Sequence, residues 1–249
     1  MRSALLTLLT ATTLTLGACG DPDPKTDVSS TPPAPGGAPV ASTPPATTPE
    51  TTPADAQPQT VKVKKGECAD VQAPQPKSPD APKPSGKLPT DVRNILTLRT
   101  SCGIIKIELD AKDNPKTANS VAELAKSGYY DGLGFHRTVE GFVIQGGDPA
   151  GNGSGGPSWK VVEAPSEKTK YTAGVVAMAK TATEAAGTSG SQFFIVTAPD
   201  VGLPPEYAVA GKVVKGQDVA ELIAKQGTKG TDGPPTKPVV IFSAKVSQK

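Results

Sequence analysis

Histidine, cysteine and aromatic residues are scarce in this chain. Its 249 residues include one histidine, three cysteines and five Phe, four Tyr and one Trp. A single histidine, with no pair of carboxylates at ligand spacing, leaves too few ligands to predict a metal site. Lysine and arginine number 26 against 24 acidic residues, and the two signs are interspersed. Without a basic stripe interleaved with aromatics, we expect no nucleic-acid partner.

Aromatic residues and prolines occupy different parts of the chain. All the aromatic residues lie between residues 129 and 242, whereas 17 of the 27 prolines lie between residues 20 and 90. Residues 20–90 consist largely of Pro, Thr, Ala, Ser, Gln and Lys, so apolar burial cannot offset the entropy of ordering them. We predict a disordered tether over residues 20–90 and a folded domain over residues 91–249.

Residues 1–19 have the pattern of a secretory signal peptide. Arg2 precedes an uncharged apolar run that is too short to span a membrane stably as a helix. The small residues Gly17 and Ala18 before Cys19 resemble the bacterial lipoprotein box, in which the cysteine is lipidated and becomes the mature N-terminus. We therefore expect an extracytoplasmic protein that is lipid-anchored to the bacterial cell envelope through Cys19. Secretion without an anchor is the alternative.

Cys68 and Cys102 are the remaining thiols if Cys19 is lipidated. Export to an oxidising compartment would allow them to form a disulfide between the end of the tether and the first strands of the domain. Such a bond closes a loop of about 35 residues and would stabilise the fold by roughly 3–4 kcal/mol on the loop-entropy argument. Two free thiols are the alternative.

The pattern of residues 91–249 predicts many strands and two helices. Asn114 before Pro115 is typical of a helix start, and Gly128 marks the end of that helix. Helices are predicted at residues 115–127 and 217–226. Strands are predicted at residues 95–100, 104–109, 137–145, 174–179, 192–197, 207–214 and 238–246. This order favours a closed, mainly antiparallel barrel with helices at its ends.

The stretch 135–148 concentrates aromatic, cationic and amide side chains. Strand alternation places Arg137, Val143 and Gln145 on one face. A serine hydrolase would need His136 as its base, but the chain has no G-x-S-x-G elbow. We expect His136, beside Phe135, to be a core histidine that is hydrogen-bonded to backbone. The remaining side chains suit an apolar pocket with one cation and one amide, which binds without proton transfer or a covalent step.

These motifs, in this order, resemble the cyclophilin family of peptidyl-prolyl cis-trans isomerases. The resemblance rests on Phe135-His136-Arg137, on Gly141 through Asp148, on Gly190 through Ile195, and on Val209 through Val213. It extends from about residue 96 to residue 246. It implies a closed eight-stranded antiparallel barrel with two capping helices, a groove for X-Pro peptides, and no cofactor.

The resemblance also implies a role for each matching residue. Arg137 falls on the catalytic arginine, Phe142 and Phe194 on walls of the proline pocket, and Gln145 and Gln192 on groups that position the substrate backbone. The implied catalytic residues are Arg137, Gln145 and Phe142, and the implied substrate-binding residues are Val143, Ala179, Gln192, Phe194, Leu203 and Tyr207.

Two positions depart from the family pattern. Tyr207 stands where many members have His, and no Trp lies near Gly202 or Leu203, where cyclosporin-sensitive members have one. Since an indole donor and its apolar area are missing there, we expect weak cyclosporin binding.

The sequence thus predicts a monomeric, lipid-anchored isomerase that accelerates X-Pro rotation in exported proteins and aids their folding. Its partners would be X-Pro segments of unfolded or exported proteins, together with the membrane. The alternative is a non-catalytic proline-peptide-binding chaperone or envelope adaptor of the same fold.

Overall fold

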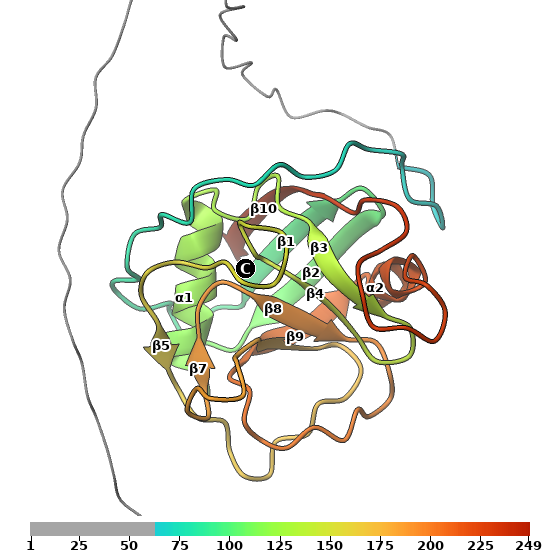
Figure 1. Ribbon diagram of the computed structural model, residues 1–249. Coiled ribbons are helices and arrows are strands. Elements are labelled where there is room, and N and C mark those ends of the chain that lie inside the picture. The colour runs from blue at the N-terminus through green and yellow to red at the C-terminus, as the bar shows by residue number, and fades with distance from the viewer. Residues whose placement is uncertain (1–62) are drawn as a thin grey trace, which may run out of the picture. The chain divides into compact units, whose positions relative to one another are not determined.

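The computed structural model of the protein describes residues 63–249 (Figure 1). The predicted signal peptide, its lipidation site Cys19 and residues 20–62 of the predicted tether lie outside the described residues. Over residues 63–249, none of the helices combines the length and apolar character needed to cross a bilayer.

Eight strands form one curled sheet in which every neighbouring pair is antiparallel. They are β1 (Asn94–Thr100), β2 (Gly103–Leu109), β3 (Phe135–Val139), β4 (Val143–Gly146), β6 (Val175–Met178), β8 (Phe193–Val196), β9 (Val209–Lys215) and β10 (Ile241–Gln248). Their order across the sheet is β10-β1-β2-β9-β6-β8-β4-β3. A separate small sheet pairs β5 (Val161–Val162) with β7 (Thr188–Ser189).

The two outermost strands, β3 and β10, meet without forming a ladder. An isolated antiparallel bridge joins Gly134 to Val240, immediately before these strands begin. The backbone N–H of Phe135 also donates to the carbonyl of Val239 at 3.0 Å. The predicted mainly β fold with eight antiparallel strands and two helices is confirmed, but "closed" overstates a sheet whose last seam is a single bridge.

Alternating burial in β2 shows how the sequence builds the core. Ile105, Ile107 and Leu109 are buried, whereas Lys106 and Glu108 between them are partly exposed. Successive side chains of a strand point to opposite faces, so this alternation directs one apolar row into the curled sheet. The helices α1 (Pro115–Lys126) and α2 (Gln217–Ala224) cover opposite ends of the sheet in Figure 1.

The start of α1 is capped differently from the prediction. Asn114 precedes the helix, but its side chain makes no capping bond and instead donates to Asp110 at 2.7 Å. The carboxylate of Glu163 accepts the backbone N–H groups of Lys116 and Thr117 at 3.1 and 2.8 Å. A carboxylate from a distant loop therefore satisfies the free N–H groups at this helix end, where the helix dipole also favours negative charge.

Residues 68–90, named the strap below, lie along the domain and run from the side of α2 to α1 (Figure 1). Leu88 is buried in the core, and the indole of Trp159 donates to the carbonyl of Ala81 at 3.0 Å. The amide of Asn119 in α1 donates to the carbonyl of Ser85 at 3.3 Å. The structure therefore differs from the predicted tether, which continued to residue 90, because polar contacts and one buried leucine order the strap.

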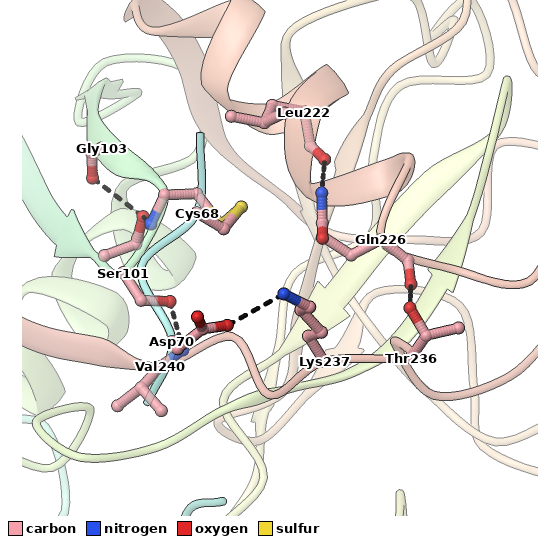
Figure 2. The surroundings of a disulfide bond; sticks show 11 residues. Cys68, Asp70, Ser101, Gly103, Leu222, Gln226, Thr236, Lys237 and Val240 are labelled. Carbon is pink, nitrogen blue, oxygen red and sulfur yellow. Dashed lines mark hydrogen bonds and ion pairs between the residues drawn. A yellow bond between two sulfur atoms is a disulfide. The ribbon is translucent and has the colours of Figure 1, made fainter. Parts of the chain in front are cut away.

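A disulfide between Cys68 and Cys102 fixes the first residue of the strap to the turn between β1 and β2 (Figure 2). The backbone N–H of Ala69 donates to the carbonyl of Ser101 at 2.7 Å. Lys237 forms an ion pair with Asp70 of the strap at 2.9 Å. The strap is thus attached both to the sheet and to the segment that follows α2.

Candidate active site

Three neighbouring strands bring the central residues of the predicted site together. Arg137 in β3 pairs with Gln145 in β4, and Gln145 pairs with Phe194 in β8. Directly paired residues on adjacent strands point to the same face of a sheet. The pairing therefore aligns a guanidinium, an amide and an aromatic ring in one row.

This row borders a cavity of about 190 Å³. Its lining consists of Arg137, Phe142, Val143, Gln145, Ala179, Lys180, Phe194, Leu203 and Tyr207. These are the predicted site residues except Gln192, with Lys180 in addition. A larger cavity of about 640 Å³ beside β2 and β9 is lined by none of the predicted site residues. The smaller cavity is the one in which the predicted chemistry comes together.

The apolar wall is fixed by an aromatic cluster. The rings of Phe194 and Tyr207 meet edge to face with their centroids 5.4 Å apart, and Tyr171 packs against both. The Tyr171 hydroxyl donates to the carbonyl of Tyr207 at 2.7 Å and accepts the N–H of Tyr207 at 2.9 Å. Burial raises the pKa of Tyr171 to about 12, which keeps it a neutral donor. Tyr171 therefore holds Tyr207 against the pocket.

Arg137 is the charged group of the pocket. Its Nη1 donates to Oε1 of Gln145 at 3.2 Å, and its Cζ lies 5.9 Å from the ring centroid of Phe142. Its Nε and Nη2 donate to the two carboxylate oxygens of Asp232, each at 2.6 Å. These hydrogen bonds raise the pKa of Arg137 above its ordinary value. The guanidinium therefore stays charged throughout the physiological pH range.

A chain of amides fixes Gln145. Its Nε2 donates to Oε1 of Gln192 at 3.0 Å, so its oxygen faces Arg137. Nε2 of Gln192 donates in turn to the carbonyls of Gly153 and Gly155 at 2.9 and 2.8 Å. Gln192 thus lies behind Gln145 and links it to the loop that contains Gly153 and Gly155. The predicted amide pair is brought together, but only Gln145 lines the pocket.

Two charged residues of this region, Lys180 and Asp232, are not predicted from the sequence. Lys180 lies with its Nζ 5.7 Å from the ring centroid of Tyr207 and forms an ion pair with Glu206 at 3.1 Å. Its side chain is only 3% exposed. Asp232 follows α2 and is 95 residues from Arg137 in the chain. Neither residue lies in a strand or a helix, so no hydrophobic period could have indicated them.

His136 does not make the backbone hydrogen bonds that the sequence analysis expected. Both of its ring nitrogens are buried, and neither has a hydrogen-bond partner within residues 63–249. Burial is the main cause that lowers the pKa of His136. The positive charge of Arg137 lowers this pKa further, and the negative charge of Asp148 partly raises it. The imidazole is half-buried and lines a separate cavity of about 220 Å³ together with Pro74 and Pro149, and it does not line the pocket.

Neutral His136 should make stability depend on pH. The unfolded chain binds the proton at an ordinary pKa of about 6.5, whereas the folded protein binds it only at lower pH. The stability linked to this residue is present above about pH 6.5 and is lost as the pH falls through the lowered folded pKa. Urea unfolding between about pH 7.5 and pH 5 should show this loss. The loss should be smaller in His136→Leu, and an equal pH dependence in both proteins would contradict the assignment.

Comparisons with known proteins agree with this geometry. A family model described as cyclophilin type peptidyl-prolyl cis-trans isomerase/CLD matches residues 95–246. The chain is 38% identical over 143 residues to the peptidyl-prolyl cis-trans isomerase CYP18-2 of Arabidopsis thaliana, which covers 56% of this chain and 85% of the relative. It is 41% identical over 141 residues to the human peptidyl-prolyl cis-trans isomerase-like 1, which covers 55% and 83%.

A solved structure gives the same result for the fold. A cyclophilin type peptidyl-prolyl cis-trans isomerase of Cryptosporidium parvum, crystallised in the presence of the dipeptide Ala-Pro, superposes with a TM-score of 0.57. It is 30% identical in sequence, and the match covers 62% of this chain and 99% of that one. One conclusion follows from the family match, from the curled sheet and from the row of guanidinium, amide and aromatic ring. The chain belongs to the cyclophilin-type peptidyl-prolyl cis-trans isomerase family.

Proposed function

We propose that this isomerase acts as a monomer on X-Pro segments of exported proteins, with Arg137 directed at the prolyl nitrogen. The observation that supports this most strongly is the composition of the 190 Å³ cavity, where a single guanidinium faces Phe142, Val143 and Phe194. A cavity of this size and polarity suits the ring of a proline residue. The Cryptosporidium parvum relative, whose crystal contained Ala-Pro, supports the same class of ligand.

The reaction needs no proton transfer. Rotation about an X-Pro bond faces a barrier of about 18–20 kcal/mol because it breaks the resonance of the amide. As the bond twists, the prolyl nitrogen becomes pyramidal and gains a lone pair, which accepts a hydrogen bond more strongly than the planar amide does. A guanidinium donor at that nitrogen therefore stabilises the transition state more than the ground state.

The pocket supplies the fixed frame for this rotation. Phe142, Val143 and Phe194 would hold the proline ring while the preceding carbonyl turns, and Gln145 would position the flanking backbone. The titratable side chains that line the cavity are Arg137, Lys180 and Tyr207. None of these is a carboxylate or an imidazole, which agrees with a mechanism that has no general base.

The extracytoplasmic location rests on two observations. Residues 1–19 carry the secretory pattern that ends at Cys19, and residues 63–249 contain the Cys68–Cys102 disulfide. Disulfides persist in oxidising compartments such as those outside the bacterial cytoplasm. Lipidation at Cys19 would keep the enzyme at the membrane where exported chains emerge and fold.

Fractionation of cells that produce the full chain tests the location. We expect the protein in the detergent phase after phase separation, and Cys19→Ala in the aqueous phase. Intact-mass analysis should show lipid on residue 19. In the same preparations, the full chain should accelerate the proline-limited refolding phase of a secreted protein. Aqueous partitioning of the unaltered chain would overturn the anchor, and an unchanged refolding rate would overturn the folding role.

Cyclosporin should bind weakly. The one tryptophan of the chain, Trp159, donates its indole N–H to Ala81 of the strap and does not line the pocket. Leu203 occupies the pocket wall near the position where cyclosporin-sensitive relatives have Trp, so the donor and its apolar area are missing. Calorimetric titration should give a Kd at least about tenfold weaker than for a Trp-bearing relative. In Leu203→Trp the affinity should increase, and equal affinities of the unaltered protein and the relative would contradict the prediction.

A further inference from the structure

We propose that Asp232 is a positioning residue for catalysis, which holds the guanidinium of Arg137 in the orientation that the reaction uses. The inference rests on the proposed role of Arg137. It adds a residue from the loop after α2 to the row of Arg137, Gln145 and Phe194, which is built on β3, β4 and β8. This loop is named the 225–240 loop below.

The hydrogen-bond geometry assigns Asp232 to one edge of the guanidinium. The group has five N–H donors in a rigid plane, one on Nε and two on each Nη nitrogen. Nε and Nη2 each donate to a different oxygen of Asp232 at 2.6 Å, the bidentate arrangement that fixes the plane as well as the distance. Nη1 donates to Gln145 at 3.2 Å. One donor on each Nη nitrogen remains for a ligand in the cavity.

The backbone places Asp232 beside Arg137. The N–H of Thr138, the residue after Arg137, donates at 2.8 Å to the carbonyl of Gly233, the residue after Asp232. These two residues also form an isolated antiparallel bridge. The loop is therefore paired with β3 at the point where the two side chains meet. The ion pair does not depend on a long side chain reaching across solvent.

Further bonds hold the 225–240 loop in shape. The backbone N–H and the hydroxyl of Thr236 both donate to the carbonyl of Gln226, at 2.7 and 2.8 Å. Gly227 and Pro235 form another isolated bridge. Figure 2 shows Thr236 bonded to Gln226 and, on the same loop, Lys237 directed at Asp70 of the strap. The carboxylate of Asp232 thus extends from a loop that is closed on itself and attached at both sides.

Asp232 has two opposing effects on Arg137. Its negative charge weakens the field that the guanidinium exerts on a substrate, whereas its two hydrogen bonds orient the donors. The Asp232 side chain is 57% exposed, so water screens its charge, while a hydrogen bond to the prolyl nitrogen depends on the direction of the donor. Without Asp232, the polar contact that fixes the guanidinium is the longer one to Gln145. Orientation therefore outweighs the lost charge, and removal of Asp232 should slow the reaction.

The test compares Asp232→Asn with Asp70→Asn in the full chain, using cis-trans exchange of an Ala-Pro-Phe peptide. The amide in Asp232→Asn keeps one acceptor oxygen and replaces the other with an NH2 group, so it cannot accept Nε and Nη2 on separate oxygens. We expect kcat to fall about tenfold. A fully misplaced group would cost about a hundredfold, but Gln145 still holds Nη1. KM should change by less than about twofold because the pocket walls are intact. Asp70→Asn removes the other ion pair of the 225–240 loop and should leave kcat unchanged.

Two further measurements separate positioning from a purely structural role. The Nε–H of Arg137 should give a distinct, slowly exchanging NMR signal that disappears in Asp232→Asn while the thermal unfolding midpoint stays within a few degrees. Asp232→Glu, which retains two carboxylate oxygens, should recover part of the lost kcat. The inference would be overturned if Asp232→Asn lost the Nε–H signal but kept or raised its kcat. It would also be overturned if the unaltered protein showed no such Nε–H signal. Absence of exchange with the unaltered protein would instead contradict the role of Arg137.

Discussion

Replacement of Arg137 by alanine is expected to lower kcat for an X-Pro peptide by about 10²–10³-fold, the usual cost of removing one preorganised donor to a transition state. KM should change little because the apolar walls formed by Phe142, Val143 and Phe194 remain. Lysine should not restore the rate. An ammonium has no planar fork, so it cannot bind both oxygens of Asp232 and still direct a donor into the cavity.

Steady-state isomerisation assays at about pH 7.5 measure this effect, since the raised pKa of Arg137 keeps its guanidinium charged there. Arg99→Ala is the matched control because Arg99 is exposed on β1 and does not line the cavity. We expect its kcat to remain within about twofold of the unaltered enzyme. An Arg137→Ala enzyme that kept its rate would show that the pocket alone lowers the barrier.

Removal of the Cys68–Cys102 disulfide should have the largest effect on stability. The bond joins residues 34 apart in the chain, so its loss should lower the free energy of unfolding by roughly 3–4 kcal/mol on the loop-entropy argument. For a folded domain of this size the unfolding midpoint should fall by about 10 °C. The variant should change Cys68 and not Cys102. Cys102 is only 2% exposed, so a polar replacement at residue 102 would add a burial cost of its own.

Thermal and urea unfolding with and without reductant provide the measurement and its control. Reductant should destabilise the unaltered protein to about the level of Cys68→Ala and leave that variant unchanged. The isomerase rate should stay within about twofold, because no residue of the strap lines the cavity. Equal stability of the oxidised and reduced proteins would mean that the bond does not constrain the unfolded chain.

The core and half of the site follow from local patterns. The alternation of Ile105, Ile107 and Leu109 predicts a strand with one buried face, and that face points into the sheet. The same period of two places Arg137 and Gln145 on one face, as they are, but the predicted single strand over residues 137–145 is wrong. Residues 140–142 form a turn between β3 and β4, and this hairpin pairs Arg137 directly with Gln145. Such features depend on residues that are near one another in the chain, and hydrophobic periodicity reports these reliably.

Other features depend on contacts between distant segments, which no local pattern encodes. Asp232 reaches Arg137 only because Gly233 pairs with Thr138, and nothing in the sequence near residue 232 indicates this bridge. The composition of the strap predicts a disordered tether because it contains so few large apolar residues. It is ordered instead by a disulfide, by the buried side chain of Leu88 and by hydrogen bonds to carbonyl groups, which a count of apolar residues does not register.

The central claim is that a positioned guanidinium in an apolar pocket accelerates X-Pro rotation. Exchange spectroscopy on an Ala-Pro-Phe peptide tests it most directly, because binding and isomerisation are observed in one sample. The unaltered protein at a small fraction of the peptide concentration should catalyse cis-trans exchange. Arg137→Ala should bind the peptide with a Kd within about threefold and yet lower the catalysed exchange rate by about 10²–10³-fold. Binding by the unaltered protein without faster exchange, or undiminished exchange in Arg137→Ala, would contradict the claim.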